Sequence, residues 1–105
     1  MAVQVLSLAS GQVQTATATI YTSTNVTTIV KSIRLVNTGS APVIVNVYLY
    51  RLANADTRHL WPLAMTLAGY ALAVDDQEVT MSSGDMITAG ASASGVDFVI
   101  SGIQR

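Results

Sequence analysis

The sequence predicts an all-β fold: an antiparallel β-sandwich, jelly-roll-like, with seven to eight strands in a single domain over residues 1–105. Two observations predict it. Val, Ile and Thr dominate and recur with a period of two, which is the side-chain period of a β-strand. Clusters of Gly, Ser, Asn and Asp interrupt these stretches at short intervals, as turns do in sandwiches. A chain of 105 residues suits one domain around one core.

The first half of the chain carries the clearest strand patterns. Thr alternates with Ala and Ile in residues 15–21. Longer alternating stretches cover residues 28–37 and 43–51, and the turn-forming residues 37–42 lie between them. Two strands separated by so short a turn are typical of a β-hairpin. We therefore expect residues 28–37 and 43–51 to pair with each other.

The second half predicts shorter elements. Residues 52–58 are expected to form a loop, and residues 59–61 a short strand that stops at Pro62. Residues 63–75 favour irregular structure or one turn of helix, because Gly69 interrupts them. Three further strands are expected at 78–81, 86–89 and 96–103, separated by a turn at 82–85 and a loop at 90–95.

Both faces of the long strands carry apolar residues. The alternation predicts one buried set: Ile33, Leu35, Val45, Val47, Leu49, Phe98 and Ile100. The opposite face carries a second set: Val30, Val36, Ile44, Tyr48, Tyr50, Val99 and Ile103. A sandwich strand normally gives its second face to water, so an apolar second face indicates a contact surface. The second set is therefore the predicted interface with another copy or another protein, unless residues 52–75 cover it.

The composition narrows the function. Five basic and six acidic residues give a net charge of -1, and half of the residues are apolar. Globular chains average about 25% charged residues, so such a surface favours burial in an assembly. The scattered basic residues predict no nucleic-acid binding. The longest apolar stretch, residues 60–74, is too short to span a membrane, and neither a signal peptide nor a disulfide is expected.

The residues that could carry chemistry predict no enzyme. His59 is the single histidine, with Asp56 nearby as a possible orienting partner, but no nucleophile motif accompanies them. Asp75, Asp76 and Glu78 could bind a cation, with Asp85 and Asp97 elsewhere in the chain. These carboxylates lack the spacing of a calcium loop. We expect no catalytic site, no cofactor and no metal.

Two binding motifs remain as alternatives. Trp61 with Tyr48, Tyr50 and Tyr70 could form a platform on which sugars stack, although Trp61 lies in an apolar stretch that favours packing. Asn25-Val26-Thr27 fits a glycosylation acceptor. It is expected to be a chance match, because no secretory signal accompanies it.

Several segments resemble a family of small β-sandwich structural proteins of tailed bacteriophages and prophages. The matching segments are Ile33-Arg34-Leu35-Val36-Asn37-Thr38 with the strand 43–50, Leu67-Ala68-Gly69-Tyr70 leading to Asp75-Asp76, Ala91-Ser92-Ala93, and residues 96–102. The resemblance covers residues 20–103 and departs from the family at Thr24-Asn25-Val26, where a Pro-Ala-Gly turn is common. It implies a virion-associated structural protein, made in the host cytoplasm.

Three functions follow as hypotheses. The first is a capsid decoration (cement) protein that self-associates, with a trimer favoured, and binds the major capsid protein. The second is a structural component of a neck or tail ring or of a tail appendage. The third is a carbohydrate- or receptor-binding module. The number of copies per particle separates the first two, and glycan binding that depends on Trp61 would favour the third.

Overall fold

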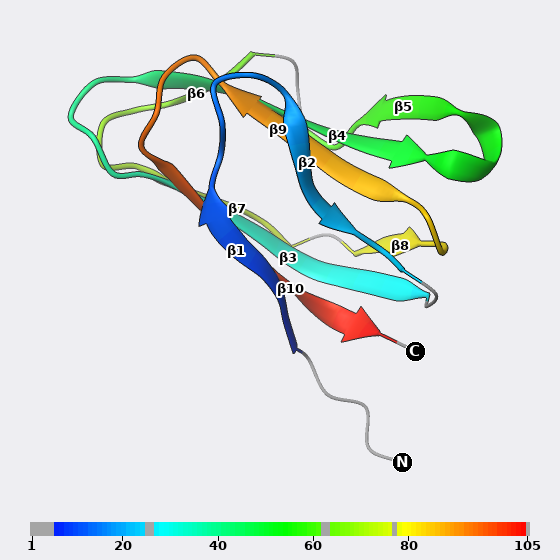
Figure 1. Cartoon of the computed structure of the whole chain (residues 1–105). Helices are drawn as coiled ribbons and strands as arrows, with labels where there is room; N and C mark the ends of the chain where they lie inside the picture. Colours follow the sequence, from blue (N-terminus) through cyan, green and yellow to red (C-terminus); the bar gives the residue numbers. More distant parts are fainter. Residues whose placement is uncertain (1–5, 25–26, 62–63, 77, 105) are drawn as a thin grey trace.

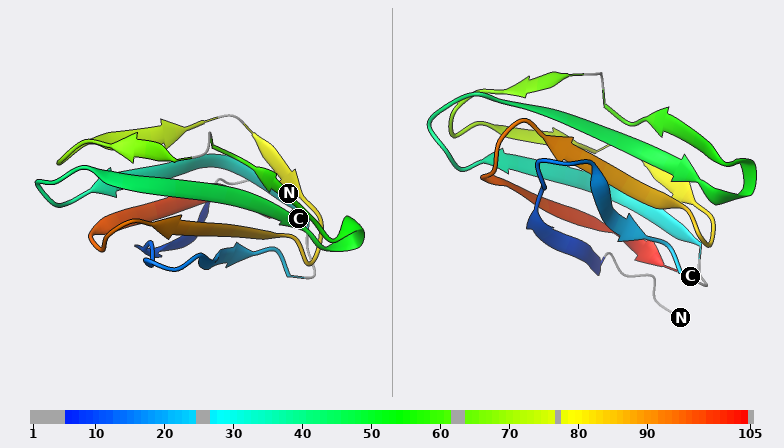
Figure 2. Two further views of the ribbon diagram at one scale, coloured as in Figure 1. Left: turned by 90° about the horizontal axis from the view of Figure 1, so that it is seen from above. Right: turned by 45° about the horizontal axis from the view of Figure 1, so that its top comes forward.

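The structure of the chain is a computed structural model that describes residues 6–24, 27–61, 64–76 and 78–104. It consists of two antiparallel sheets packed face to face, which confirms the predicted β-sandwich (Figure 1). The described residues include no α-helix and only one 3-10 turn, η1 (Leu52–Asn54). Figure 2 shows the two layers and the β4–β5 hairpin that extends at one end of them.

Each sheet has four strand positions. Sheet A contains, in order, β1 (Leu6–Gln12), β10 (Val96–Gln104), β3 (Thr28–Asn37) and, along the free edge of β3, both β7 (Leu72–Asp75) and β8 (Val79–Met81). Sheet B contains β2 (Ala18–Thr22), β9 (Met86–Ala91), β4 (Val43–Arg51) and, along the free edge of β4, both β5 (Asp56–His59) and β6 (Met65–Leu67). The ten strands of the described part of the chain thus occupy eight positions, because one edge strand of each sheet is interrupted.

The order of the strands is that of a jelly roll. The chain alternates between the sheets: β1, β3, β7, β8 and β10 lie in sheet A, and the strands between them lie in sheet B. Double-sheet jelly rolls have eight strand positions connected in this way. The predicted jelly-roll-like arrangement is therefore correct, although the described residues form ten strands where seven to eight were expected.

The predicted hairpin of residues 28–37 and 43–51 is wrong. β3 and β4 lie in different sheets, and β3 pairs instead with β10, β7 and β8. The turn between them is a corner that crosses the sandwich. Asn37, at the end of β3, holds this corner: its Nδ2 donates to the carbonyl oxygens of Ala41 at 2.8 Å and of Leu67 at 3.2 Å.

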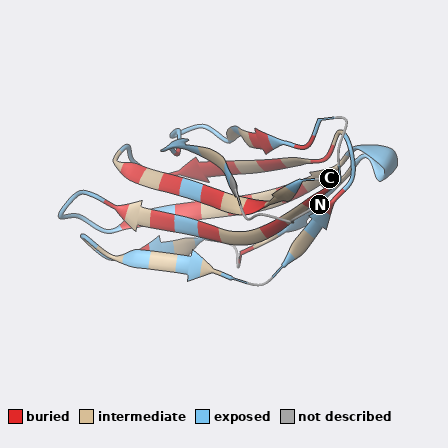
Figure 3. Cartoon of the chain, turned by 90° about the horizontal axis from the view of Figure 1, so that it is seen from below, coloured by how far each residue is buried: buried red, intermediate tan, exposed pale blue. Residues whose placement is uncertain are grey.

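The core lies between the sheets, and the alternation of the strands fills it (Figure 3). All seven residues that the sequence assigned to the core are buried: Ile33, Leu35, Val45, Val47, Leu49, Phe98 and Ile100. β4 contributes an uninterrupted row of them, because every second residue from Val43 to Leu49 points inward. A buried chain of hydroxyls also connects the sheets. Tyr21 Oη of β2 lies 3.1 Å from Thr28 Oγ1 of β3.

Val30 is a correction to the predicted interface. It is 1% exposed and belongs to the core. Ser101 of β10 pairs with Ser32, but the next residue, Gly102, pairs with Val30, so that Lys31 is an extra residue in β3. Such a β-bulge reverses the inward and outward alternation of the strand. Ile29, which an uninterrupted alternation would place on the same side as Ile33 and Leu35, is consequently only half-buried.

Several segments expected to be loops are strands. Residues 52–58 contain most of β5, and the expected strand at 59–61 contributes only His59 to it. The stretch 63–75 contains β6 and β7 rather than a turn of helix. Pro62 and residue 63 lie outside the described residues. The strand expected at 15–21 begins at Ala18, and β1, which was not expected, precedes it.

Candidate functional site

The predicted interface residues fall on two opposite faces of the sandwich. Ile44, Tyr48 and Tyr50 of β4 point outward from sheet B. Val36 of β3, with Val99 and Ile103 of β10, points outward from sheet A. Since the sheets pack through their inner faces, these two sets lie on opposite sides of the molecule. The structure therefore divides the predicted single contact surface into two, and Val30 belongs to neither.

The outer face of sheet B is built around the two tyrosines of β4. The strand register places His59 and Thr88 on either side of Tyr48, and Thr57 and Met86 on either side of Tyr50. The Tyr48 and His59 rings are in contact, with their centroids 4.9 Å apart and their planes inclined by 52°. Both tyrosines are half-buried in the sheet surface, whereas Ile44, farther along β4, is 43% exposed.

This face carries no Asp, Glu, Lys or Arg among the outward residues that the structure describes. Its remaining positions hold Asn46, Thr66, Thr19 and Thr22. The charges of the neighbouring hairpin lie on the alternate positions: Asp56 pairs with Arg51, and Arg58 with Leu49, across β4 and β5. We call Ile44, Asn46, Tyr48, Tyr50 and His59, with their threonine and methionine neighbours, the sheet B face.

The described part of residues 52–75 does not cover the sheet B face. β5 and β6 pair edge to edge with β4, so they widen the sheet instead of lying over it. Trp61, between them, is buried against the core. The described part of residues 52–75 therefore leaves the outer face of β4 uncovered, and Tyr48 and Tyr50 remain accessible.

The outer face of sheet A differs from the sheet B face, because it carries both apolar and charged side chains. Across β7, β3 and β10 the register forms two rows of three outward residues. We call these six residues the sheet A patch: Leu72, Val36 and Asp97 in one row, and Val74, Arg34 and Val99 in the other. Leu72, Val74 and Val99 are 56%, 49% and 39% exposed. Beside the patch, Ser32, Arg34, Val99 and Ser101 line a shallow hollow of about 280 Å³.

Leu72 and Val74 were missed as surface residues by the sequence analysis. The signal that could have found them is the alternation Ala71-Leu72-Ala73-Val74, which places both large residues on one side of a short strand. Gly69 and the adjacent loop obscured it. Tyr70 precedes β7 with a positive φ of 59° and is highly exposed.

The residues considered for catalysis are not brought together as an acid–base pair. His59 packs on Tyr48, while Asp56 pairs through Oδ2 with Arg58 Nη2 at 3.1 Å. Glu78 forms an ion pair with Lys31. Within the described residues, no group of three or more His, Cys, Asp or Glu side chains is placed to hold a metal ion.

The four aromatic residues considered for sugar binding do not form one platform. Trp61 is 4% exposed and lies in the core. Tyr70 precedes β7 of sheet A, and Tyr48 and Tyr50 lie on the sheet B face. Of the possible glycosylation acceptor, Asn25 and Val26 lie outside the described residues.

Comparison with known proteins adds no family assignment. No protein-family model matches the chain, and no curated protein sequence is significantly similar to it. As for membranes, none of the described segments is a helix with the length and apolar character that crossing a bilayer would require.

Proposed function

We propose that the protein is a non-catalytic structural component of a tailed-bacteriophage particle, and specifically a decoration protein that binds the capsid shell through the sheet B face. The observation that carries this proposal is that face itself. It is accessible, free of charged side chains among its described residues, and centred on two half-buried tyrosines.

The chemistry of the sheet B face suits protein docking. Tyrosine is enriched in interfaces because its ring buries apolar area while its hydroxyl finds a hydrogen-bond partner. Charged residues are depleted from interface cores, because removing a charge from water costs more than most contacts return. Packing of Tyr48 against His59 holds the ring in place, so less side-chain entropy is lost when it is covered.

The fold and the resemblance support the same proposal without carrying it. Jelly rolls occur in viral capsid domains, but they also occur in lectins, so the architecture alone does not assign a function. The phage-protein resemblance of residues 20–103 favours a structural protein of the virion, and it fits a capsid, neck or tail position equally. The charge content agrees with a protein that is covered by neighbours rather than free in solution.

The proposal is tested with particles that lack the protein. A decoration protein binds only the assembled shell, so it stabilises the shell by mass action. Particles without it should assemble but rupture at lower temperature or under milder osmotic shock, and added protein should restore resistance and saturate at hundreds of copies. Saturation at tens of copies near the tail vertex would assign the protein to the neck or tail. Resistance that does not depend on the protein would refute a decoration role.

A carbohydrate-binding module is the second candidate, favoured by one observation. Tyr48 and His59 present adjacent rings on a face rich in threonine hydroxyls. Aromatic rings and hydroxyls are also what a sugar-binding surface offers. Binding of host surface glycans that is lost in Tyr48→Ala, with no binding to particles, would support this function over the first.

A further inference from the structure

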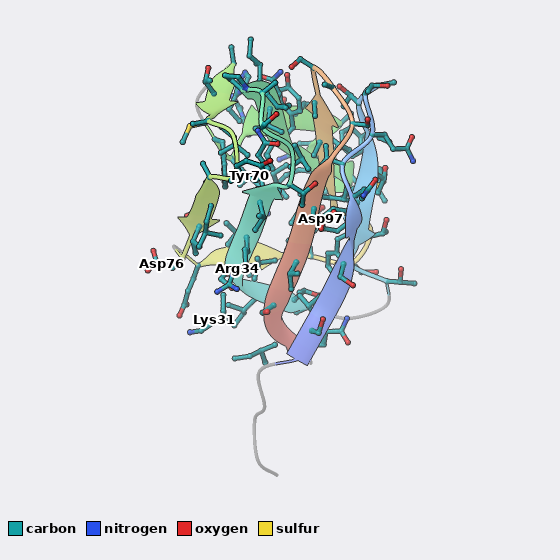
Figure 4. The ribbon with its side chains drawn as sticks, turned by 90° about the vertical axis from the view of Figure 1, so that its left-hand side faces the viewer. Lys31, Arg34, Tyr70, Asp76 and Asp97 are labelled. Atoms are coloured by element: carbon teal, nitrogen blue, oxygen red, sulfur yellow. The ribbon has the colours of Figure 1, made fainter. Side chains whose placement is uncertain are left out.

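The sheet A patch contains two opposite charges that pair neither with each other nor with any other residue that the structure describes. Arg34 of β3 and Asp97 of β10 occupy diagonal positions, because Arg34 lies opposite Val99 and Asp97 lies opposite Val36. Diagonal positions on neighbouring strands are about 7–8 Å apart. Among the residues that the structure describes, neither side chain forms an ion pair or a hydrogen bond, and Figure 4 shows both on the outer face of sheet A.

The rest of the patch is apolar. Val74 and Val99 lie on either side of Arg34, and Leu72 lies next to Val36 in the other row. An exposed cluster of large apolar residues is unusual on a surface that stays in water, and the two charges within it have no partner among the described residues. It fits a partner that covers the apolar residues and supplies one negative and one positive group at matching positions.

We propose that the partner is a second copy of this chain, which packs its own sheet A patch on the first, so that Arg34 of each copy pairs with Asp97 of the other. A two-fold axis in the plane of the interface, along the diagonal from Val36 to Val99, exchanges the positions of Arg34 and Asp97. The same axis brings Val36 and Val99 against their own counterparts. Two ion pairs and an apolar centre therefore arise from one symmetry operation, as an isologous contact requires.

The geometry and the charge of the chain agree with this contact. Because the two-fold axis runs diagonally to the strands, the strands of one copy cross those of the other at a steep angle. Sheets that pack face to face are known to adopt such crossing angles. A net charge of -1 gives little long-range repulsion between copies. The shallow hollow beside Arg34 gives the side chains of the second copy room to settle. The contact produces dimers, whereas the sequence favoured trimers.

This inference rests on the proposed function only for the expectation of self-association, and it uses the face opposite the shell-binding one. The sheet A contact and the decoration role can therefore be refuted independently of each other. A chain that docks on shells but stays monomeric in solution would contradict the sheet A contact only. A chain that dimerises through sheet A but does not bind shells would contradict only the decoration role.

Charge reversal tests the contact in solution. Each single variant, Arg34→Asp or Asp97→Arg, replaces both ion pairs of the dimer by two pairs of like charges. Each should therefore raise the dissociation constant of the dimer by about tenfold or more. A 1:1 mixture of these two variants should recover the dimer mass. In the mixed dimer the new carboxylate at position 34 of one chain meets the new guanidinium at position 97 of the other, and the remaining pair is the native one. The double variant should also dimerise. Sedimentation equilibrium at micromolar concentrations measures both single variants, their mixture and the double variant.

The matched control is Arg58→Asp, which makes the same change on β5, away from the patch. It should dimerise like the original chain. Circular dichroism of each variant checks the fold, and the milder Asp97→Asn replaces any variant that does not fold. An original chain that is monomeric throughout the concentration range, or single variants that dimerise as well as it does, would overturn the proposal.

Discussion

Arg51 donates a hydrogen bond through Nη1 to Oδ2 of Asp85 at 3.2 Å, and this pair ties the end of β4 to the turn before β9. The carboxylate of Asp85 is buried and also accepts from the backbone N–H of Leu52 at 3.1 Å and of Ser82 at 3.0 Å. A buried carboxylate is stable when such donors surround it. Asp85 therefore fixes the turn end of the β4–β5 hairpin, where Arg51 ends β4 and Leu52 begins η1.

Removing Asp85 should destabilise the fold strongly. Asp85→Ala leaves two backbone N–H groups without their acceptor, so we expect the free energy of unfolding to fall by about 3 kcal/mol. Asp85→Asn keeps one acceptor oxygen and should cost about half as much. Urea unfolding measures both. Asp56→Ala, which removes an exposed ion pair with Arg58, is the control and should change stability by less than about 1 kcal/mol. Equal effects at the two positions would contradict this role of Asp85.

The bulge at Lys31 predicts which valines belong to the core. Val30→Ala and Val47→Ala should each lower the free energy of unfolding by about 1–3 kcal/mol, through lost transfer energy and the cavity left behind. Val99→Ala, on the outer face of sheet A, should cost less than about 0.5 kcal/mol at a protein concentration too low for self-association. If Val30→Ala were as mild as Val99→Ala, β3 would continue without the bulge.

Trp61 offers a test of buried polarity. Its indole N–H is buried and has no hydrogen-bond partner among the described residues. Trp61→Ala should cost about 3–5 kcal/mol, because it removes a large core side chain. Trp61→Phe should cost far less, because it keeps most of the apolar volume and removes an unsatisfied donor. Thermal unfolding of both variants measures the difference. Equal losses would mean that the indole N–H makes a hydrogen bond.

The two faces should respond differently to salt. Self-association through Arg34 and Asp97 should weaken as NaCl rises from about 0.05 M to about 0.5 M, because the screening length shortens from roughly 14 Å to roughly 4 Å. Shell binding through the sheet B face should change little, because that face offers few charges to screen. Sedimentation and particle-binding titrations across this range measure the two. If salt weakened shell binding and left self-association unchanged, sheet A would be the shell-binding face and sheet B the self-association face.

The sequence predicted the class of fold and the inner faces of the strands better than their pairing. The valines of β4 alternate without interruption, so their burial followed from periodicity alone. The same periodicity does not say which strands are neighbours, and a short turn fits a hairpin and a sheet-crossing corner equally well. The hairpin of residues 28–37 and 43–51 was therefore predicted where the chain changes sheets.

The candidate surfaces show the same limit. Outward positions such as Tyr48 and Val99 were predicted correctly as outward, but their division between two faces depends on sheet membership, which periodicity does not give. Val30 was placed outward because no residue within β3 itself marks the bulge at Lys31. Gly102, which pairs with Val30 there, is a partial signal: a Cβ atom on it would lie 2.3 Å from the carbonyl oxygen of Ile29.

The central claim is that the sheet B face binds the shell, and one binding measurement tests it most directly. Particles that lack the protein are titrated with the original chain, with the double variant Tyr48→Ala/Tyr50→Ala, and with the control Tyr70→Ala. Circular dichroism first verifies that each of these proteins is folded. We expect the double variant to bind at least about tenfold more weakly, a loss of about 1.4 kcal/mol or more, as for interface anchors, and Tyr70→Ala to bind like the original chain. Undiminished binding by the double variant would contradict the claim.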